Sequence, residues 1–231
     1  MPHPSGCGGV IPMMACSGKL FPVARIIPVT DPACVDEAVR LLAGGQLVCI
    51  PTDTVYGIAA VAVKDAAVRT LYAVKGRSPD KPLPLLIADA AAASWIADVT
   101  PVAHTLMSRF WPGPLTIVMR KAPGFRSLAL ARKETVGLRV PDHALVRRII
   151  LALDEPITGT SANRAGARPP VSAAEVAFQM GDMVALVIDG GSPVRGREST
   201  VIDITHGPPR VVREGVVSRE ELSRVLGKEV A

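Results

Sequence analysis

The stretch Lys75-Gly76-Arg77-Ser78-Pro79-Asp80-Lys81-Pro82 carries three cations, one glycine and two prolines. Proline fixes its own φ and disfavours the α region for the residue before it, so we expect a stiff, extended loop that is not helical. A helical pattern that opens at Asp65 precedes this loop, and an apolar run over residues 83–88 follows it. A helix, a short loop and a buried strand in succession are typical of an α/β fold.

The charges of this loop also point to a ligand. Cations held on a stiff loop suit a polyanion such as a triphosphate, because they neutralise it without covalent chemistry. The alternative is a solvated run of charges and turn formers. The surroundings favour the ligand, since a strand-like segment over residues 47–51 runs into Thr52-Asp53-Thr54-Val55-Tyr56-Gly57 just upstream.

The rest of the chain alternates short apolar runs with helical patterns. Helices are expected to open at Asp31 (with Pro32 in the first position), Asp65, Asp89, Thr100, His143, Ser172 and Ser218. Strands are expected over residues 46–50, 55–60, 83–88, 114–120, 135–140, 156–160, 185–189, 199–204 and 209–213. Some strands follow one another without a helix between them. We therefore predict an α/β fold with a twisted, open, mixed parallel and antiparallel sheet and helices on both faces. The connection 121–134 exceeds ordinary loop lengths and is expected to be mobile.

Length and composition indicate a single domain. The 231 residues are 48% hydrophobic, which is enough apolar material for one large α/β core. Residues 1–22 are interpreted as a disordered tail and residues 23–231 as one folded domain. The formal net charge of +5 favours anionic partners such as a nucleotide or RNA, whereas an aromatic content of 3% argues against a base-stacking platform.

Several classes of site have no motif in this sequence. The four cysteines form no CxxC pair and the four histidines are scattered, which predicts free thiols in a reducing compartment and no metal site built by the protein. Walker A, GxGxxG, GxSxG and HExxH sequences are absent. No apolar run reaches membrane-spanning length, and residues 1–20 make a poor signal or transit peptide, so we expect a cytoplasmic protein.

Four polar clusters are expected at strand ends, where open α/β sheets place their ligands. They are Thr52–Tyr56, Arg139, Thr160–Asn163 and Glu198–Thr200. Thr160–Asn163 offers hydroxyl and backbone N–H groups that suit phosphate oxygens, or else forms an ordinary Asx or Ser/Thr turn. Arg139 lies in an apolar strand, where a salt bridge and a substrate carboxylate explain it equally well. Arg213 ends another strand, where a surface charge is the commoner explanation.

Seven segments in a fixed order resemble a known family. They are PTDTVYG at 51–57, KGRSPDKPLPLLI at 75–87, FWPGPLT at 110–116, GLRVP at 137–141, TSAN at 160–163, ESTVID at 198–203 and VREG at 212–215. Over residues 26–217 the chain thereby resembles the YrdC/TsaC family, the L-threonylcarbamoyladenylate synthases, in their single-domain form.

The resemblance implies a YrdC-like fold and an enzyme, a nucleotidyltransferase. Members of the family join L-threonine, bicarbonate and ATP into threonylcarbamoyl-AMP and pyrophosphate, with ATP as a substrate and Mg²⁺ bound through its phosphates. The product feeds the t6A modification of tRNAs that read ANN codons. This implies a partner, the t6A transferase complex that receives the adenylate. Direct contact with tRNA is a further expectation, and a membrane partner is not expected.

The resemblance also assigns roles to residues. Those implied for ATP are Lys75, Arg77, Lys81, Thr135, Ser161, Asn163 and Arg213. The first two are also the implied catalytic residues, and no metal ligand is implied. Those implied for threonine are Arg139, which takes the carboxylate, and Thr54, Tyr56 and Ser199. The family often has His at the position of Leu86, so we expect the threonine pocket to be lined differently here.

Two other functions stay open at this point. Larger carbamoyltransferases, including hydrogenase-maturation proteins, also contain a YrdC-like domain, but the acylphosphatase and zinc-finger segments that accompany it there are not in this sequence. The second alternative is a non-catalytic module that binds double-stranded RNA or tRNA, which the isoelectric point near 9.3 allows.

Overall fold

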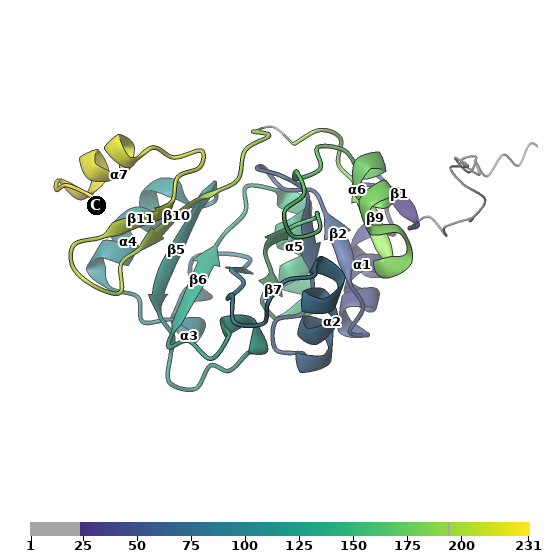
Figure 1. Cartoon of the computed structure of the whole chain (residues 1–231), viewed down its shortest axis with the longest axis horizontal. Helices are drawn as coiled ribbons and strands as arrows, with labels where there is room; N and C mark the ends of the chain where they lie inside the picture. The colour runs from purple at the N-terminus through teal and green to yellow at the C-terminus, as the bar shows by residue number, and fades with distance from the viewer. Residues whose placement is uncertain (1–23, 194) are drawn as a thin grey trace, which may run out of the picture.

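The computed structural model describes residues 24–193 and 195–231. The tail expected over residues 1–22 lies outside the described residues. Within them, helices and strands of the α/β type follow one another along the chain (Figure 1).

The described strands form two hydrogen-bonded sheets. The first sheet has the order β1-β9-β2-β3-β8 and the second the order β11-β10-β5-β6-β4-β7. The strands of the first sheet are β1 Ile26–Pro28, β9 Leu186–Asp189, β2 Val48–Ile50, β3 Gly57–Ala59 and β8 Thr160–Ser161. Those of the second are β11 Arg210–Arg213, β10 Thr200–Asp203, β5 Leu115–Arg120, β6 Thr135–Arg139, β4 Leu85–Leu86 and β7 Ile157–Thr158.

Both sheets mix parallel and antiparallel pairs. In the first sheet β9 is parallel to β1 and β2, whereas β3 is antiparallel to β2 and β8. In the second, β10 with β5 and β4 with β6 are parallel pairs, and the other pairs are antiparallel. The predicted mixed α/β class is therefore confirmed, but the strands form two sheets where one was expected. The sheets meet where the chain passes from β7 directly into β8.

The helices begin largely where the sequence predicts them. They are α1 Cys34–Ala43, α2 Asp65–Lys75, α3 Ala93–Ile96, α4 Pro101–Phe110, α5 Ala144–Leu153, α6 Ala173–Met180 and α7 Arg219–Leu226. Short 3₁₀ turns are η1 Leu128–Leu130 and η2 Gly181–Met183. Thr100, Ser172 and Ser218 each cap a helix, because each side-chain oxygen accepts a backbone N–H three residues further on (3.1–3.3 Å).

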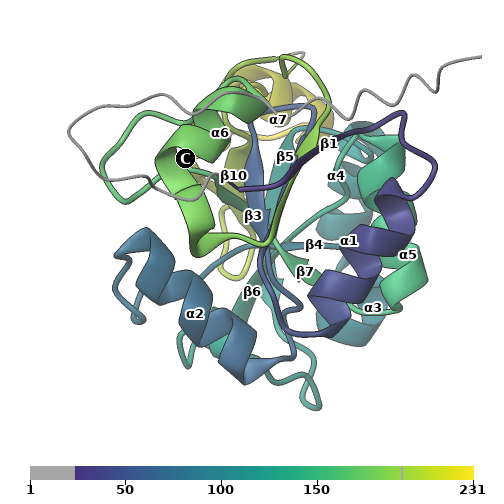
Figure 2. The same cartoon turned by 90° about the vertical axis from the view of Figure 1, so that its right-hand side faces the viewer.

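The first sheet is covered by helices on both faces. Val48 and Ile50 of β2 pack with Leu42 of α1 and Ile149 of α5 in one core cluster. Cys49 between them points the other way, into the larger cluster that includes α2 and α6. Figure 2 shows the strands between α1 and α5 on one side and α2 and α6 on the other. A strand buried on both faces explains why its sequence is an unbroken apolar run.

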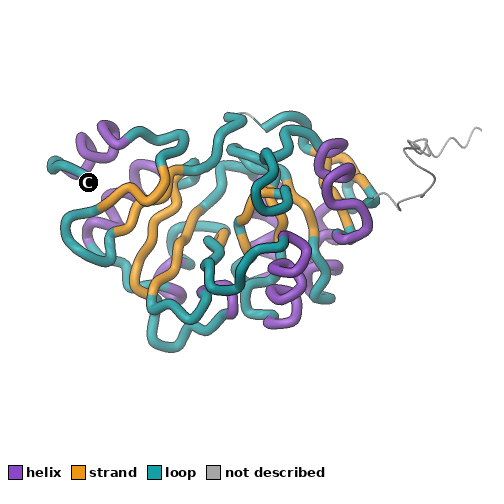
Figure 3. The backbone as a smooth tube through the Cα atoms, viewed as in Figure 1, coloured by secondary structure: helices purple, strands orange, loops and turns teal. Residues whose placement is uncertain are grey.

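Helices of the described part of the chain cover one face of the second sheet. Leu115 and Ile117 of β5 pack with Leu106 of α4 in the larger core cluster, and α7 packs against α4. Thr116, between the two apolar residues, points the other way and shares a hydrogen bond with Ser199 (3.0 Å between the hydroxyl oxygens). Loop segments lie between the two groups of strands (Figure 3).

Several boundaries differ from the prediction, and the helix expected to open at Asp89 begins only at Ala93. The helix expected to open at Asp31 begins at Cys34, and the Asp31 carboxylate instead accepts the Ala33 N–H (2.8 Å) in a turn before the helix. Lys75 is the last residue of α2 and not part of the loop. The strand expected over residues 83–88 is reduced to the two residues of β4. Pro82 and Pro84, which lack an N–H to donate, limit its pairing.

The connection 121–134, expected to be mobile, is anchored to the body of the protein. Leu130 in η1 is buried. The backbone oxygen of Ala129 accepts the Leu83 N–H (2.8 Å), and the Ser127 hydroxyl donates to the backbone oxygen of Ala62 (2.5 Å). The segment therefore has buried residues and hydrogen bonds of its own, and its mobility stays a prediction.

Two of the four cysteines can be located. Cys34 and Cys49 are buried free thiols, as predicted, and burial raises the pKa of both. Cys7 and Cys16 lie outside the described residues. In the part of the chain that the structure describes, no helix has both the length and the apolar character that a membrane crossing requires.

Candidate functional site

A cavity of about 360 Å³ lies between the two sheets, with walls from both. Ser161 comes from β8 of the first sheet and Arg139 from β6 of the second. Nine of the predicted site residues line it: Thr54, Lys75, Arg77, Lys81, Arg139, Ser161, Asn163, Ser199 and Arg213. Segments far apart in the sequence therefore meet at one place, as the strand-end pattern predicts.

Two predicted residues do not line the cavity. Tyr56 is fully buried, and its hydroxyl donates to the backbone oxygen of Gly191 (2.7 Å) and accepts the Gly190 N–H (3.2 Å). Its place is therefore to hold the segment that follows β9. Thr135 pairs with Arg120 and lies at the opposite end of β6 from Arg139.

Lys75 is a fixed, buried cation at the end of α2. Gly76 adopts a left-handed conformation (φ +60°) and ends the helix there. The Lys75 ammonium donates to the backbone oxygens of Ser161 (2.5 Å) and Asn163 (2.8 Å). Desolvation, and next the nearby charge of Arg77, lower the pKa of Lys75 from its ordinary 10.5 to about 8. An ammonium has more hydrogens than these two bonds use, so one remains for a ligand.

Arg77 shapes the loop that follows. Its Nε donates to the backbone oxygen of Lys81 (3.3 Å) and its Nη2 to that of Pro82 (2.9 Å). The guanidinium therefore closes the loop on itself while lining the cavity. The loop is held by this contact as well as by its prolines.

Asn163 serves both a turn and the cavity. Its side-chain nitrogen donates to the backbone oxygens of Arg164 (3.0 Å) and Ala167 (2.5 Å). These bonds form a local turn, which is one of the two explanations that the sequence allows for this segment. Its side-chain oxygen is buried and has no hydrogen-bond partner within residues 24–193 and 195–231. Because buried polar atoms are normally paired, this oxygen is suited to a ligand donor.

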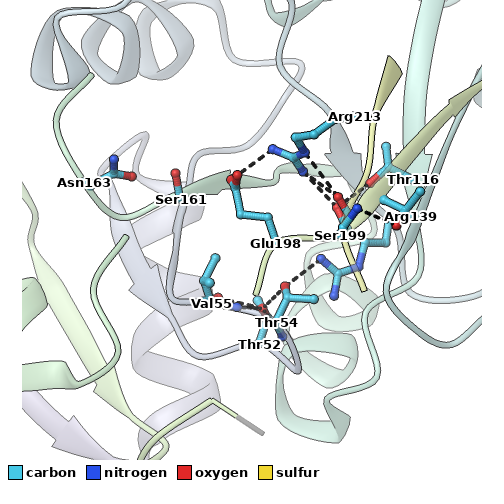
Figure 4. Close-up of polar contacts among 12 residues, drawn as sticks. Thr52, Thr54, Val55, Thr116, Arg139, Ser161, Asn163, Glu198, Ser199 and Arg213 are labelled. Atoms are coloured by element: carbon cyan, nitrogen blue, oxygen red, sulfur yellow. Dashed lines mark hydrogen bonds and ion pairs between the residues drawn. The ribbon is translucent and has the colours of Figure 1, made fainter. Parts of the chain in front are cut away.

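Arg139 is buried and held by three hydrogen bonds. Its Nε donates to the backbone oxygen of Gly113 (2.8 Å), its Nη1 to the Thr54 hydroxyl (2.9 Å) and its Nη2 to the carboxylate of Asp53. The salt bridge, one of the two explanations of Arg139 that the sequence allows, is therefore present. A guanidinium has more N–H groups than these bonds use, and Arg139 also lines the cavity, so a ligand carboxylate is compatible with the salt bridge. Figure 4 shows Arg139 and Thr54 in contact at this wall.

Asp53 and Glu198 lie in polar clusters that the sequence predicts at strand ends, but neither acid was assigned a role there. Asp53, inside the PTDTVYG segment, is buried and pairs with Arg139. Glu198 lines the cavity and forms a salt bridge with Arg213 (2.9 Å). Arg213 also donates to the backbone oxygen of Ser199 (2.9 Å), as Figure 4 shows. An acid within a predicted polar cluster, in a chain that also has an arginine to pair, is the signal that could have given either residue its role.

Leu86 and Gly159 form the apolar part of the wall. Leu86 is opposite Arg139 in the pairing of β4 with β6, so the two side chains are neighbours on one face. A Cβ atom at Gly159 would lie 2.8 Å from Leu86 Cδ2, which is too close for an ordinary contact. Only glycine fits there while Leu86 keeps its position.

The charge of the cavity defines what it can hold. Its described lining contains five cationic side chains, Lys75, Arg77, Lys81, Arg139 and Arg213, and one acidic side chain, Glu198. Within the described residues, no group of three or more His, Cys, Asp or Glu side chains is arranged to hold a metal ion. Fold and site together define an α/β protein with a predominantly cationic cavity between two mixed sheets, a charge that suits an anionic ligand.

Comparison with known proteins agrees with this class. Residues 40–215 match the model of the Sua5_yciO_yrdC family, described as "Telomere recombination". The chain belongs to the Sua5/YciO/YrdC family. A Pyrococcus abyssi protein named threonylcarbamoyl-AMP synthase is 38% identical over 195 residues, which cover 82% of this chain and 57% of that protein. A Mycobacterium tuberculosis protein named putative threonylcarbamoyl-AMP synthase is 38% identical over 201 residues, covering 84% and 90%.

Solved structures share the fold. The crystal structure of P. abyssi Sua5 complexed with L-threonine matches with a TM-score of 0.84 and 35% identity, over 90% of this chain and 62% of that one. Escherichia coli YciO matches with a TM-score of 0.78 and 25% identity, over 87% and 100%. The chain thus spans little more than half the length of some curated relatives, at 57% and 56% for the P. abyssi and Bacillus subtilis proteins.

Proposed function

We propose that this chain is a threonylcarbamoyl-AMP synthase, which joins L-threonine, bicarbonate and ATP and releases pyrophosphate. The observation that carries the proposal is the excess of cations around one cavity, which suits a triphosphate together with an amino-acid carboxylate. The names of the similar proteins support the same reaction. The relative whose title includes L-threonine supports threonine as the amino acid.

In this proposal the nucleotide lies against the first sheet and the basic loop. The residues that hold the triphosphate are Lys75, Arg77, Lys81, Ser161 and Arg213, all of which line the cavity. Asn163, whose unpaired side-chain atom is an acceptor, meets a donor of the nucleotide such as a ribose hydroxyl. Lys75 is supported by its fixed position, because two backbone oxygens hold the ammonium at the wall. Thr135 does not line the cavity and receives no role.

Threonine lies against the second sheet in the same proposal. Arg139 takes the carboxylate through the N–H groups that its three hydrogen bonds leave free. Thr54 and Ser199 provide hydroxyl groups at the same wall. Tyr56, which does not line the cavity, supports the site by holding the segment after β9.

The chemistry needs positioning and charge neutralisation. The neutral amine of threonine attacks the carbon of bicarbonate, and loss of water leaves a carbamate. A carbamate oxygen then bonds to the α-phosphorus of ATP while the bond from that phosphorus to the bridging oxygen breaks, and pyrophosphate leaves. Lys75 and Arg77 offset the negative charge on the phosphoryl oxygens, and Mg²⁺ entering with the nucleotide as part of the substrate does the same.

The test is the exchange of radioactive pyrophosphate into ATP. We expect exchange that requires both threonine and bicarbonate, since the carbamate is the attacking group. Lys75→Ala and Arg77→Ala should each abolish it. Lys64→Ala is the matched control, because Lys64 lies at the other end of α2, away from the cavity. Binding of tRNA without any exchange would favour the non-catalytic RNA-binding alternative.

The proposal extends to organisation and partners. Residues 23–231 act in it as a single catalytic domain, and the adenylate passes to a t6A transferase complex. Direct contact with tRNA and a cytoplasmic location stay predictions. Co-purification of the chain with its acceptor complex under physiological salt checks the partner.

A further inference from the structure

A second hollow begins one residue beyond the wall of the cavity. Leu86 lines the cavity, and the residues that follow it, Ile87 to Asp89, line a separate groove of about 640 Å³. Trp95 of α3 and Leu151 of α5 form further parts of its lining. The proposed reaction makes no use of this groove.

Exposed apolar side chains gather in this groove. Of the five large hydrophobic side chains exposed in the described part of the chain, Trp95, Leu151 and Val63 line it, with exposed fractions of 83%, 67% and 38%. The other two, Phe178 and Val212, do not line it. Single exposed apolar residues are common, but a cluster marks an interaction surface.

The charges along the described lining of the groove are all negative. Asp89, Asp154 and Glu155 line it, and none of them forms a salt bridge among the residues described. Within residues 24–193 and 195–231, no Lys or Arg lines it. Arg147 comes near, donating its Nε–H to the backbone oxygen of Ala88 (3.1 Å), but it is not part of the lining. The chain as a whole has a net charge of +5, so the charge of this groove is opposite in sign to that of the chain.

We propose that this groove docks a cationic amphipathic segment of a partner protein. The apolar side of such a segment would cover Trp95 and Leu151, and its Lys or Arg side chains would meet the carboxylates at the rim. An anionic segment would be repelled, and a purely apolar one would desolvate the carboxylates without supplying a counter-charge. The combination of apolar and acidic lining therefore selects the occupant.

The test uses a synthetic amphipathic helix of leucine and lysine, about 15 residues long so that it can be helical. Trp95 is a built-in reporter, because the other tryptophan, Trp111, is only 9% exposed. We expect the probe to shift the tryptophan emission to shorter wavelength. Leu151→Ala should weaken binding about five- to tenfold, as loss of an interface anchor does. The double variant Asp154→Asn with Glu155→Gln should weaken it and reduce its dependence on salt.

The matched control is Phe178→Ala, which removes an apolar side chain that is 91% exposed but outside the groove. It should leave the affinity unchanged. The proposal is overturned if Phe178→Ala and Leu151→Ala weaken binding equally, or if a leucine–glutamate helix binds as tightly as the lysine one. It is also overturned if sedimentation shows a dimer that Leu151→Ala dissolves, since the occupant would then be a second copy of this chain.

Discussion

Asp53 holds Arg139 from behind the cavity wall. The Asp53 carboxylate accepts a hydrogen bond from Nη2 of Arg139, and the two side chains are 4% and 7% exposed. The same carboxylate accepts the Asp142 N–H (3.2 Å). Arg139 lines the cavity and Asp53 does not. Asp53 therefore fixes the position of the guanidinium without itself reaching a ligand.

Replacing Asp53 by Asn should destabilise the protein and weaken threonine binding together. The change leaves the buried Arg139 charge without its counter-charge, which costs about 3–5 kcal/mol when a buried pair is broken. Denaturant unfolding measures the stability, and calorimetry measures threonine binding. Unfolding at the wild-type denaturant concentration would contradict the buried ion pair.

The matched control for this prediction is the double variant Asp53→Asn with Arg139→Gln. It removes both charges, so most of the lost stability should return. Threonine binding should stay weak, by about one to two decades in affinity, because the carboxylate loses its charged donor. The two readouts thus separate the structural role of the pair from its role in binding.

Affinity for ATP should fall as the pH rises above about 8. Lys75 has a folded-state pKa lowered to about 8, so it is charged below that pH and loses its proton above it. A bound triphosphate favours the charged form, hence the affinity is complete below pH 8 and is lost as the pH rises through that value. Calorimetry across the range, compared with Lys75→Met, checks this.

In Lys75→Met the affinity for ATP should be weak at every pH between 7 and about 9. Lys81→Met, which removes an exposed lysine from the following loop, is the control and should keep the pH dependence of the wild type. A wild-type affinity that does not change across this range would show that Lys75 is not the group responsible.

Gly159→Ala should weaken threonine binding about tenfold or more, as overpacking by a methyl group costs on the order of 1–3 kcal/mol. The new Cβ would lie 2.8 Å from Leu86, a side chain of the cavity wall that must then shift. Adding Leu86→Ala should restore part of the affinity. Gly124→Ala is the control, since a Cβ there meets nothing within 4 Å. Equal effects of the two glycine changes would contradict the argument.

Leu86→His should widen the preference for threonine over valine. Leu86 lines the cavity beside Arg139 but offers no hydrogen bond to the threonine hydroxyl. A histidine would satisfy that hydroxyl and leave its own polar atom unpaired with valine, a difference worth about threefold to tenfold. The ratio of kcat/KM for the two amino acids measures it. An unchanged ratio would mean that the side chain at position 86 does not meet the substrate hydroxyl.

The sequence predicted local features of the site better than its assembly. Lys75, Arg77 and Lys81 were found because cations and prolines together are rare in a helix or strand. Arg139 was found because a charge inside an apolar strand demands a partner. The pairing of Asp53 with Arg139 was not predicted, since nothing in the sequence shows that residues 53 and 139 meet.

The same limit explains which parts of the fold could be predicted from the sequence. Helix starts at Thr100, Ser172 and Ser218 follow from local hydrogen bonds, which short sequence patterns encode. The division into two sheets depends on which strands pair across the chain, and this is set by tertiary packing. Predicting residues 156–160 as one strand therefore failed at Gly159, where the chain changes from one sheet to the other.

Because the chain passes from β7 directly into β8, we expect the two sheets to unfold as a single thermodynamic unit. The cavity takes its walls from both sheets, so a molecule bound there contacts both and stabilises their association. A ligand that prefers the assembled state raises the melting temperature by mass action. Thermal shift therefore offers a search for substrates in which no turnover has to be measured.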